Sequence, residues 1–383
     1  MPEKDCYEII LNHNCDLACR FCSQSDFSPG LRTPAEEAVR RIYSARKAGY
    51  RRIGFSGGEA LLRRDLPSLV AAARKVGFRA VRLQTNGMKL ADAGLARTLA
   101  RAGLTVCKFT FLSHKAGVHD ALTGRAGAFA ASLRGLDNMI TLRLSVGVNL
   151  LITKSNYKTL PGTLAFFMRR GVTNFVLIYP IYTGSMLKNY RRDGVPIPAA
   201  APFVEKALAL ASASGLDGDI KALNLPPCAL GRHGDKAVDL YKFNTVIYSP
   251  RGLTWNLDEN VAAAREQGRP CAVCALRRRC PGVDKAYVEL FGWEGIHAAK
   301  KRTAGTRIKP LPGYLNAMEA CFMEILGTET GISTRRVLAL ARSIPICQDC
   351  RDGNGVLTTG LALEKKGLVR REFKKGGYIW RLP

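Results

Sequence analysis

The chain has 383 residues, of which 47% are hydrophobic and 23% are charged, so it is neither a disordered nor a low-complexity protein. No run approaches the roughly 18 uncharged apolar residues that a membrane span requires, and residues 1–5 lack the basic and then apolar order of a signal peptide. We therefore expect a cytoplasmic protein. The 58 Lys and Arg residues against 31 Asp and Glu residues give a net charge of +27. This charge favours anionic partners such as nucleic acid, phosphate-bearing or polycarboxylate substrates, or an acidic peptide, although a general solubility bias would give the same excess.

Strand and helix patterns alternate over residues 6–183. Apolar runs predict strands at 6–11, 52–55, 80–83, 106–112, 142–152 and 174–179. Helical patterns lie between them at 34–47, 66–76, 92–102, 127–138 and 157–170, the first with Thr33 as its N-cap and Pro34 at its first position. Repeated strand–helix units of this length predict an α/β fold with a parallel sheet, either doubly wound or curled into a partial barrel. In both cases the loops after the C-terminal ends of the strands form the site.

The remaining chain divides by composition into two further parts. Residues 184–225 are rich in Pro, Gly and Ala and predict a bridge with one helix at 203–213, and residues 226–300 hold a group of cysteines. A third unit is predicted from helical patterns at 333–343 and 357–366 and a β-hairpin at 372–382 that turns at 376–377. The predicted domains are therefore 1–183, 184–319 and 320–383.

Three of the twelve cysteines are clustered after the first predicted strand, as Cys15, Cys19 and Cys22 in the spacing C-x3-C-x2-C. In a reducing cytoplasm clustered cysteines bind metal or react rather than form disulfides. Three thiolates can hold three irons of a 4Fe–4S cluster and leave the fourth iron open to a ligand. The alternative is a zinc site that His13 completes.

The sequence around these cysteines resembles the signature of the radical S-adenosylmethionine (radical SAM) superfamily. An aromatic residue, Phe21, precedes the third cysteine, and three further landmarks follow on successive strands. Residues 56–59 (SGGE) are similar to the family's GGE motif, and residues 84–87 (QTNG) are similar to its TNG turn. Residues 111–124 (FLSHKAGVHDALTG) resemble its S-[LI]-D, H-D and [RT]-G stretch, with His114 in place of the usual Asp. The resemblance covers residues 6–183.

This resemblance implies a partial (β/α)6 TIM barrel that binds a 4Fe–4S cluster through Cys15, Cys19 and Cys22 and S-adenosylmethionine (SAM) at the open iron. One-electron cleavage of SAM then gives a 5′-deoxyadenosyl radical that abstracts a hydrogen atom from a substrate carbon, with the electron supplied by a reductant protein of the flavodoxin or ferredoxin type. In the family the glycines and the Glu of the GGE motif meet the methionine ammonium. The resemblance assigns SAM binding to Phe21, Gly57, Gly58, Glu59, Asn86, Ser113, Asn149 and Ile178. The sequence assigns no catalytic acid, base or radical-quenching residue.

A second group of cysteines comprises Cys228, Cys271, Cys274 and Cys280. The last three, in the spacing C-x2-C-x5-C, resemble the auxiliary-cluster extension called SPASM or twitch, which has a further cysteine where this chain has residues 283–284 (VD). The four thiolates suffice for a second 4Fe–4S cluster, and a structural zinc is the alternative. Cys6 and Cys107, on predicted strands, are expected to be small core residues.

Residues 332–383 resemble a winged helix-turn-helix, with seven Lys and Arg against two acids between residues 364 and 381. Such a unit binds nucleic acid, docks a peptide segment at its sheet edge, or is a structural cap with a solvated basic face. The pair Cys347 and Cys350, with Cys321 upstream, is interpreted as packing thiols or an incomplete zinc site.

Three functions follow in order of preference. The first is a radical SAM enzyme with one auxiliary cluster that acts on a peptide or protein segment docked by the C-terminal unit. The second is a radical SAM enzyme that acts on an anionic small molecule, such as a porphyrin-like cofactor precursor, or on tRNA. The third is an iron–sulfur regulator whose winged helix binds DNA.

Overall fold

The computed structural model describes residues 6–216, 220–238, 245–299, 317–341, 353–365, 367–374 and 377–382. Internal contacts divide the chain into two compact units, Met1–Lys301 and Arg302–Pro383. Residues 184–299 therefore pack with the strand–helix repeats in one unit, and each unit is described by itself. None of the helices in the described ranges is long and apolar enough to span a membrane.

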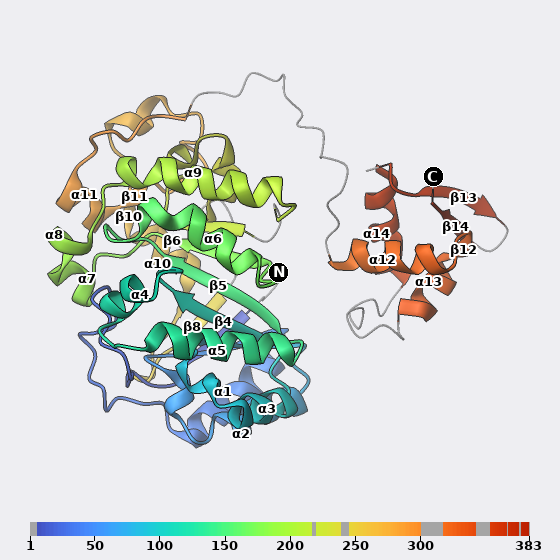
Figure 1. Cartoon of the computed structure of the whole chain (residues 1–383), viewed down its shortest axis with the longest axis horizontal. Helices are drawn as coiled ribbons and strands as arrows, with labels where there is room; N and C mark the ends of the chain where they lie inside the picture. The colour runs from blue at the N-terminus through green and yellow to red at the C-terminus, as the bar shows by residue number, and fades with distance from the viewer. Residues whose placement is uncertain are drawn as a thin grey trace. The chain divides into compact units, whose positions relative to one another are not determined.

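The first unit is built on a sheet of parallel strands that follow one another in chain order (Figure 1). These strands are β1 (Cys6–Ile10), β2 (Arg52–Ser56), β3 (Ala80–Thr85), β4 (Val106–Phe111), β5 (Ser145–Leu151), β6 (Asn174–Ile178) and β7 (Ile220–Leu223). On the other edge β8 (Thr245–Tyr248) pairs parallel to β1, and β9 (Thr254–Asn256) pairs antiparallel to β8. The prediction of a partial barrel with a parallel sheet is confirmed, and β7 and β8 extend the six predicted strands.

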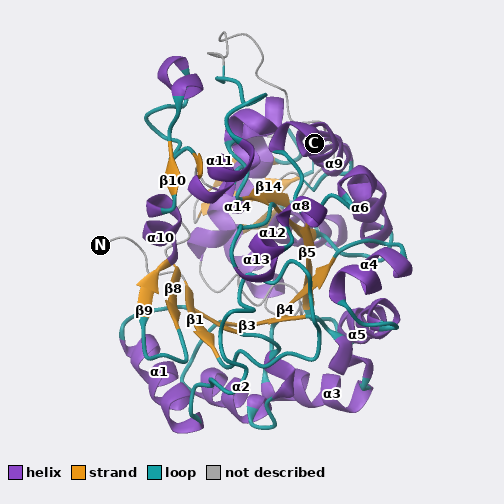
Figure 2. Ribbon diagram, turned by 90° about the vertical axis from the view of Figure 1, so that its left-hand side faces the viewer, coloured by secondary structure: helices purple, strands orange, loops and turns teal. Residues whose placement is uncertain are grey.

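Helices cover the outer face of this curved sheet (Figure 2). They are α1 (Ala35–Lys47), α2 (Leu66–Lys75), α3 (Ala93–Ala102), α4 (Ala116–Thr123), α5 (Ala128–Thr141), α6 (Leu160–Met168) and α9 (Ile197–Ala213). Shorter helices are α7 (Gly184–Lys188), α8 (Tyr190–Asp193), α10 (Leu257–Ala263) and α11 (Lys285–Phe291). Four helices are followed by glycines in the left-handed conformation, Gly49, Gly77, Gly103 and Gly171, whose φ values lie between +84° and +101°.

Strand residues alternate between a core face and an inner face. Ile53, Leu83 and Phe109 are fully buried, and apolar residues of this parity pack under the helices. Residues of the other parity, such as Arg82 and Lys108, line a cavity inside the barrel. The strand period of two therefore separates the hydrophobic core from the interior where a ligand can bind.

Local details differ from the sequence predictions, and three of the differences have a clear physical reason. Thr33 is not the N-cap of α1, because Pro34 precedes the helix and the buried Thr33 hydroxyl instead donates to the carbonyl of Ile10 at 2.8 Å. The fifth strand begins at Ser145 rather than at residue 142, since α5 continues to Thr141. Helix α9 begins at Ile197 rather than at residue 203, because Pro198 at the first turn is compatible with a helix.

Within its described residues, the second unit contains three helices and a small sheet. Its elements are α12 (Ala317–Thr328), β12 (Ile332–Ser333), α13 (Thr334–Ala341), α14 (Gly353–Lys365), β13 (Arg370–Lys374) and β14 (Gly377–Arg381), with sheet order β12-β14-β13. Trp380 is fully buried against Phe322, and its indole donates to Thr334 Oγ1 at 2.9 Å. The predicted helices and hairpin are present, whereas α12 and β12 were not predicted. Cys347, Cys350 and the side chain of Cys321 lie outside the described residues.

Candidate functional site

The three-cysteine segment lies on the loop that follows β1, at the C-terminal edge of the parallel sheet. Cys15 is exposed, and Cys19 and Cys22 are partly buried. Backbone bonds fix the loop on two sides: Ala18 N donates to Thr123 O at 3.0 Å, and Ser185 N donates to Cys22 O at 2.9 Å. The loop is therefore held by the end of α4 and by α7, which are far from it in sequence.

The backbone of the cysteine loop packs directly against Gly57 and Gly58, and we call these two residues the glycine seat. Gly58 N donates to Asn12 O at 2.8 Å and Glu59 N donates to Asn14 O at 2.7 Å. A Cβ atom on Gly57 would lie 2.4 Å from Asn12 O, and one on Gly58 would lie 2.3 Å from Asn14 O. Both positions therefore require glycine, because the backbone of the cysteine loop lies directly against them.

Glu59 joins the seat to the end of β3. Its carboxylate is 1% exposed and accepts from Leu61 N at 2.9 Å, Thr85 Oγ1 at 2.8 Å and Asn86 N at 2.8 Å. Burial raises the pKa of Glu59 to about 7, against the lowering effect of these hydrogen bonds. The Asn86 side chain in turn donates to Asp16 Oδ1 at 2.7 Å. The GGE and TNG residues thus hold the cysteine loop through direct hydrogen bonds.

The chemistry of the three thiols fits a metal cluster. Burial together with the neighbouring thiols of Cys15 and Cys22 raises the pKa of Cys19 well above its usual range. Thiolates at these positions repel one another, and bound iron would supply the positive charge that stabilises them.

The residues of the fourth landmark have structural partners. His119 is 1% exposed, packs against Phe111 and Phe129, and accepts from Leu112 N at 3.3 Å through Nδ1. Asp120 accepts from Gly127 N and Phe129 N and so holds the start of α5. Ser113 is fully buried, and its Oγ accepts from Lys115 N at 3.1 Å. His119 is therefore a packed core histidine.

The buried His119 predicts a pH dependence of stability. Burial lowers its pKa from the ordinary 6.5 to about 4. Since the folded state favours the neutral ring, its contribution is complete above pH 6.5 and is lost as the pH falls toward 4. The free energy of unfolding should fall by about 2 kcal/mol between pH 7 and pH 5 from this group alone. Denaturant unfolding at pH 7 and at pH 5 measures this change in the free energy of unfolding. The His119→Gln variant should lack the part of the change that His119 causes. An equal pH dependence of stability in the two proteins would contradict the prediction.

A cavity of about 630 Å³ lies inside the barrel next to the predicted SAM-binding residues Asn149 and Ile178, which line it. Its floor is polar: Glu8 is paired with Arg82 and accepts from Gln84 Nε2 at 2.7 Å. Lys108 crosses the interior from β4 and bonds to the Asn174 side chain. A cavity of this size is typical of a small-molecule or substrate site.

Two inward-facing glycines, Gly54 and Gly147, make room for the long side chains of Arg82 and Lys108. A Cβ atom on Gly54 would lie 2.9 Å from Glu8 Oε2 and 3.3 Å from Arg82 Nε, and one on Gly147 would lie 2.4 Å from Lys108 Nζ. Sequence reasoning missed Arg82 and Lys108. The signal was available in the alternation of β3 and β4, where Arg82, Gln84, Lys108 and Thr110 occupy inward positions.

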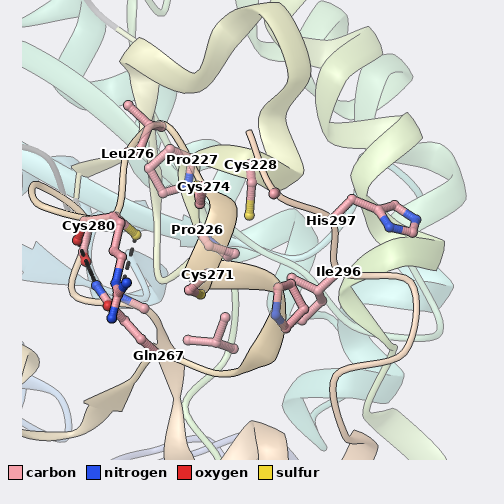
Figure 3. Close-up of a pocket in the computed structure, with 15 residues that line it drawn as sticks. Pro226, Pro227, Cys228, Gln267, Cys271, Cys274, Leu276, Cys280, Ile296 and His297 are labelled. Carbon is pink, nitrogen blue, oxygen red and sulfur yellow. Dashed lines mark hydrogen bonds between the residues drawn. The ribbon is translucent and has the colours of Figure 1, made fainter. Parts of the chain in front are cut away.

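The second group of cysteines lines one small pocket (Figure 3). Cys228 is on a 3-10 helix (Pro227–Lys236), and Cys271 is on another (Arg269–Val273). Two thiols accept backbone hydrogen bonds of 3.4 Å, Cys274 Sγ from Ala299 N and Cys280 Sγ from Gly282 N. Burial, with smaller contributions from the other three thiols, raises the pKa of Cys228 to about 12. The structure thus brings together four cysteines separated by up to 52 residues, and His297 also lines this pocket.

The cysteines of this pocket fit a thiolate-ligated cluster, because hydrogen bonds from backbone N–H groups to cysteine sulfur atoms are typical of such sites. In the part of the chain that the structure describes, no group of three or more His, Cys, Asp or Glu side chains is arranged to hold a metal ion directly. Cys6 and Cys107 are buried on β1 and β4, as predicted for core residues.

Comparisons with known proteins agree with this architecture. Residues 9–167 match the family model described as Radical SAM superfamily. Fe-coproporphyrin III synthase of Methanosarcina barkeri is 32% identical over 187 residues, which cover 48% of this chain and 46% of that protein. PqqA peptide cyclase of Xanthomonas campestris pv. campestris is 29% identical over 252 residues, covering 63% of this chain and 64% of that protein. The chain thus spans about half to just under two thirds of the length of these relatives.

Two solved structures share the fold at low sequence identity. Streptococcus suis SuiB bound to precursor peptide SuiA has a TM-score of 0.57 and 14% identity, covering 77% of this chain and 75% of that chain. Native anSMEcpe with bound AdoMet and Kp18Cys peptide has a TM-score of 0.56 and 14% identity, covering 89% of this chain and all of that chain. Residues 9–167, which carry the three-cysteine loop at the C-terminal edge of a parallel, partly closed barrel, are thus similar to the Radical SAM superfamily.

Proposed function

We propose that this protein is a radical SAM enzyme that acts on a peptide or protein segment. The observation that carries the proposal is the seat formed by Gly57 and Gly58, which fixes the three-cysteine loop at the rim of the barrel. Cys15, Cys19 and Cys22 are the residues that would hold the 4Fe–4S cluster. When bound, the cluster and SAM supply one-electron cleavage and the 5′-deoxyadenosyl radical that removes a hydrogen atom from carbon.

The chain's own residues position the cofactor and enclose the reaction. We assign Phe21, Gly57, Gly58 and Ser113 to SAM binding. Glu59 and Asn86 are assigned likewise, and they also fix the cysteine loop. Asn149 and Ile178, which line the cavity, are assigned to the ribose and adenine. The strands of the curved sheet line part of the cavity, and exclusion of water there would protect a reactive radical from stray hydrogen donors. The electron comes from a reductant protein of the flavodoxin or ferredoxin type.

A peptide substrate is supported by the names of similar proteins and by the second unit. The PqqA peptide cyclase is named for a peptide, and SuiB is bound to its precursor peptide. We assign the second unit as a winged helix, because its helices, short strand and hairpin follow that order. Within the described strands β13 is an edge whose five residues are all exposed, so an extended peptide can add to it.

Nucleic acid is the alternative partner for this unit, since Arg370, Arg371, Lys374 and Arg381 lie exposed on the hairpin. The helix that would enter a major groove, α14, exposes Thr358, Leu361 and Lys365 among its described side chains. Lys365 is the single cationic residue among these exposed side chains of α14, and this composition favours peptide docking over recognition of DNA bases.

An anionic small molecule is the second candidate substrate. It is favoured by the basic residues that line the cavity and by the similarity to Fe-coproporphyrin III synthase. Under either candidate the cysteine-rich residues 226–299 form a functional part of their own, which we assign as a SPASM- or twitch-like extension with an auxiliary 4Fe–4S cluster.

Loss of one auxiliary thiol tests this assignment. Anaerobically reconstituted protein should hold about eight iron atoms, from two four-iron clusters. Cys274→Ala should reduce this to about four iron atoms and abolish substrate turnover, because Cys274 is remote in sequence from the first loop. Substrate-free cleavage of SAM should stay within about threefold of the unchanged protein. Retention of all the iron, or tight zinc in place of iron, would contradict the assignment.

Deuterium transfer tests the proposed function directly. The reconstituted protein, SAM and a reductant are incubated with candidate peptides that carry deuterium at carbon, and 5′-deoxyadenosine is analysed by mass spectrometry. Deuterium in 5′-deoxyadenosine with a peptide supports the proposal, and transfer only from a non-peptide acid supports the second candidate. Absence of 5′-deoxyadenosine would overturn both.

A further inference from the structure

Three consecutive arginines form one wall of the barrel cavity. Arg277, Arg278 and Arg279 lie between the last two auxiliary cysteines, are exposed, and line the cavity of about 630 Å³. None of them forms an ion pair with another residue of the described ranges. The long cations of the floor differ in this respect, because Arg82 is paired with Glu8 and Lys108 bonds to Asn174. The wall therefore carries positive charge that the described protein leaves unneutralised.

The arginine segment is fixed by Gln267. The Gln267 side chain donates through Nε2 to Arg277 O at 2.8 Å and to Cys280 O at 2.7 Å, at the two ends of the segment. Gln267, Arg277 and Cys280 line both the barrel cavity and the small cysteine pocket. The two hydrogen bonds of Gln267 thus fix the backbone that carries both the Cys280 thiol and the arginine side chains beside it.

The rest of the cavity restricts what these arginines bind. Apolar side chains, including Ile181, Leu257 and Val261, line the same space, so a ligand here has an apolar part. The cavity also holds the carboxylate of Asp258, and repulsion between like charges disfavours a concentrated double charge such as a phosphate monoester there. Singly charged carboxylates suit the planar, bidentate guanidinium groups.

We infer that the part of the substrate that enters the barrel carries carboxylate groups and that Arg277, Arg278 and Arg279 bind them. This inference rests on the proposed function only in taking the barrel cavity as the substrate site. The carboxylates come either from acidic side chains of a peptide or from a free apolar polycarboxylic acid. The arginines position the substrate, and hydrogen abstraction occurs elsewhere on it.

Binding measurements on the full, reconstituted protein test the inference without requiring turnover. The first probe pair is a fluorescent peptide with four Glu residues and the same peptide with four Gln residues. The second pair is a porphyrin tetracarboxylic acid and its tetramethyl ester. The variant is the triple change Arg277→Gln, Arg278→Gln and Arg279→Gln. The matched control removes the same charge from the outer helices, through Arg97→Gln, Arg101→Gln and Arg134→Gln, because a chain of net charge +27 attracts any anion.

The triple variant should weaken binding of at least one acidic probe by about tenfold or more, whereas the control should change it by less than about twofold. Binding of the neutral partner probes should be unchanged. Loss with the peptide identifies acidic side chains as the source, and loss with the porphyrin identifies a free acid. The inference would be overturned if the two triple variants lost affinity for the acidic probes equally, or if neither variant lost affinity for them. Substrate-free SAM cleavage, measured in parallel, should be the same in the unchanged protein and in the outer-helix control, so its absence in both would indicate failure of the proposed function instead.

Discussion

Replacement of Cys19 by alanine is expected to abolish SAM cleavage, with a loss of at least about a hundredfold in 5′-deoxyadenosine formed under reducing conditions. Cys19 is the central thiol of the loop, and its pKa responds to both Cys15 and Cys22. Two remaining thiolates do not hold a four-iron cluster with one open iron. Iron content should therefore fall from about eight to about four atoms per chain, with the auxiliary cluster retained.

Cys107→Ala is the matched control for this change. Cys107 is fully buried on β4 and packs in the core, so its replacement should leave the iron content and SAM cleavage unchanged. SAM cleavage that survives in the Cys19 variant at the level of the Cys107 variant would contradict the assignment of the loop.

Replacement of Gly58 by alanine should also cause a large loss of SAM cleavage, although no metal ligand is removed. The added Cβ atom would lie 2.3 Å from Asn14 O and 2.6 Å from His13 O, and backbone cannot move aside as a flexible side chain can. We expect the cysteine loop to be displaced and the first cluster to be lost, with a decrease of at least about tenfold in SAM cleavage. Iron analysis and 5′-deoxyadenosine formation measure both effects.

Gly117→Ala is the control for the glycine change. Gly117 lies in α4, and a Cβ atom there would meet no atom within 4 Å. Its replacement should preserve iron and activity and stabilise the helix slightly. Full iron and activity in the Gly58 variant would show that the loop does not depend on this seat.

The part of the fold that the sequence predicts is local. The strands of the barrel follow from apolar runs between helices that end in glycine, and the loop of Cys15, Cys19 and Cys22 follows from spacing within eight residues. The second group of cysteines was also recognisable, although Cys228 is brought to the other three only by the tertiary fold. Strand β8 was missed because four residues carry too weak a signal, and its place is set by pairing with β1.

The parts that could not be predicted depend on contacts between distant residues. Arg20 pairs with Asp193 across 173 residues, which ties the cysteine loop to α8. Gly54 and Gly147 look like weak strand residues in sequence, and only the packed barrel shows that they make room for Arg82 and Lys108. Arg277, Arg278 and Arg279 read as an ordinary solvated charge run until the fold places them at the cavity wall.

The open iron of the first cluster is tested most directly by electron–nuclear double resonance. The reduced, reconstituted protein is mixed with SAM labelled with 17O in its carboxylate and 15N in its amine. We predict hyperfine coupling of both labels to the cluster, present in the Cys274 variant and absent in the Cys19 variant. A cluster signal that does not change when labelled SAM is added would contradict binding of SAM at a fourth iron held open by Cys15, Cys19 and Cys22.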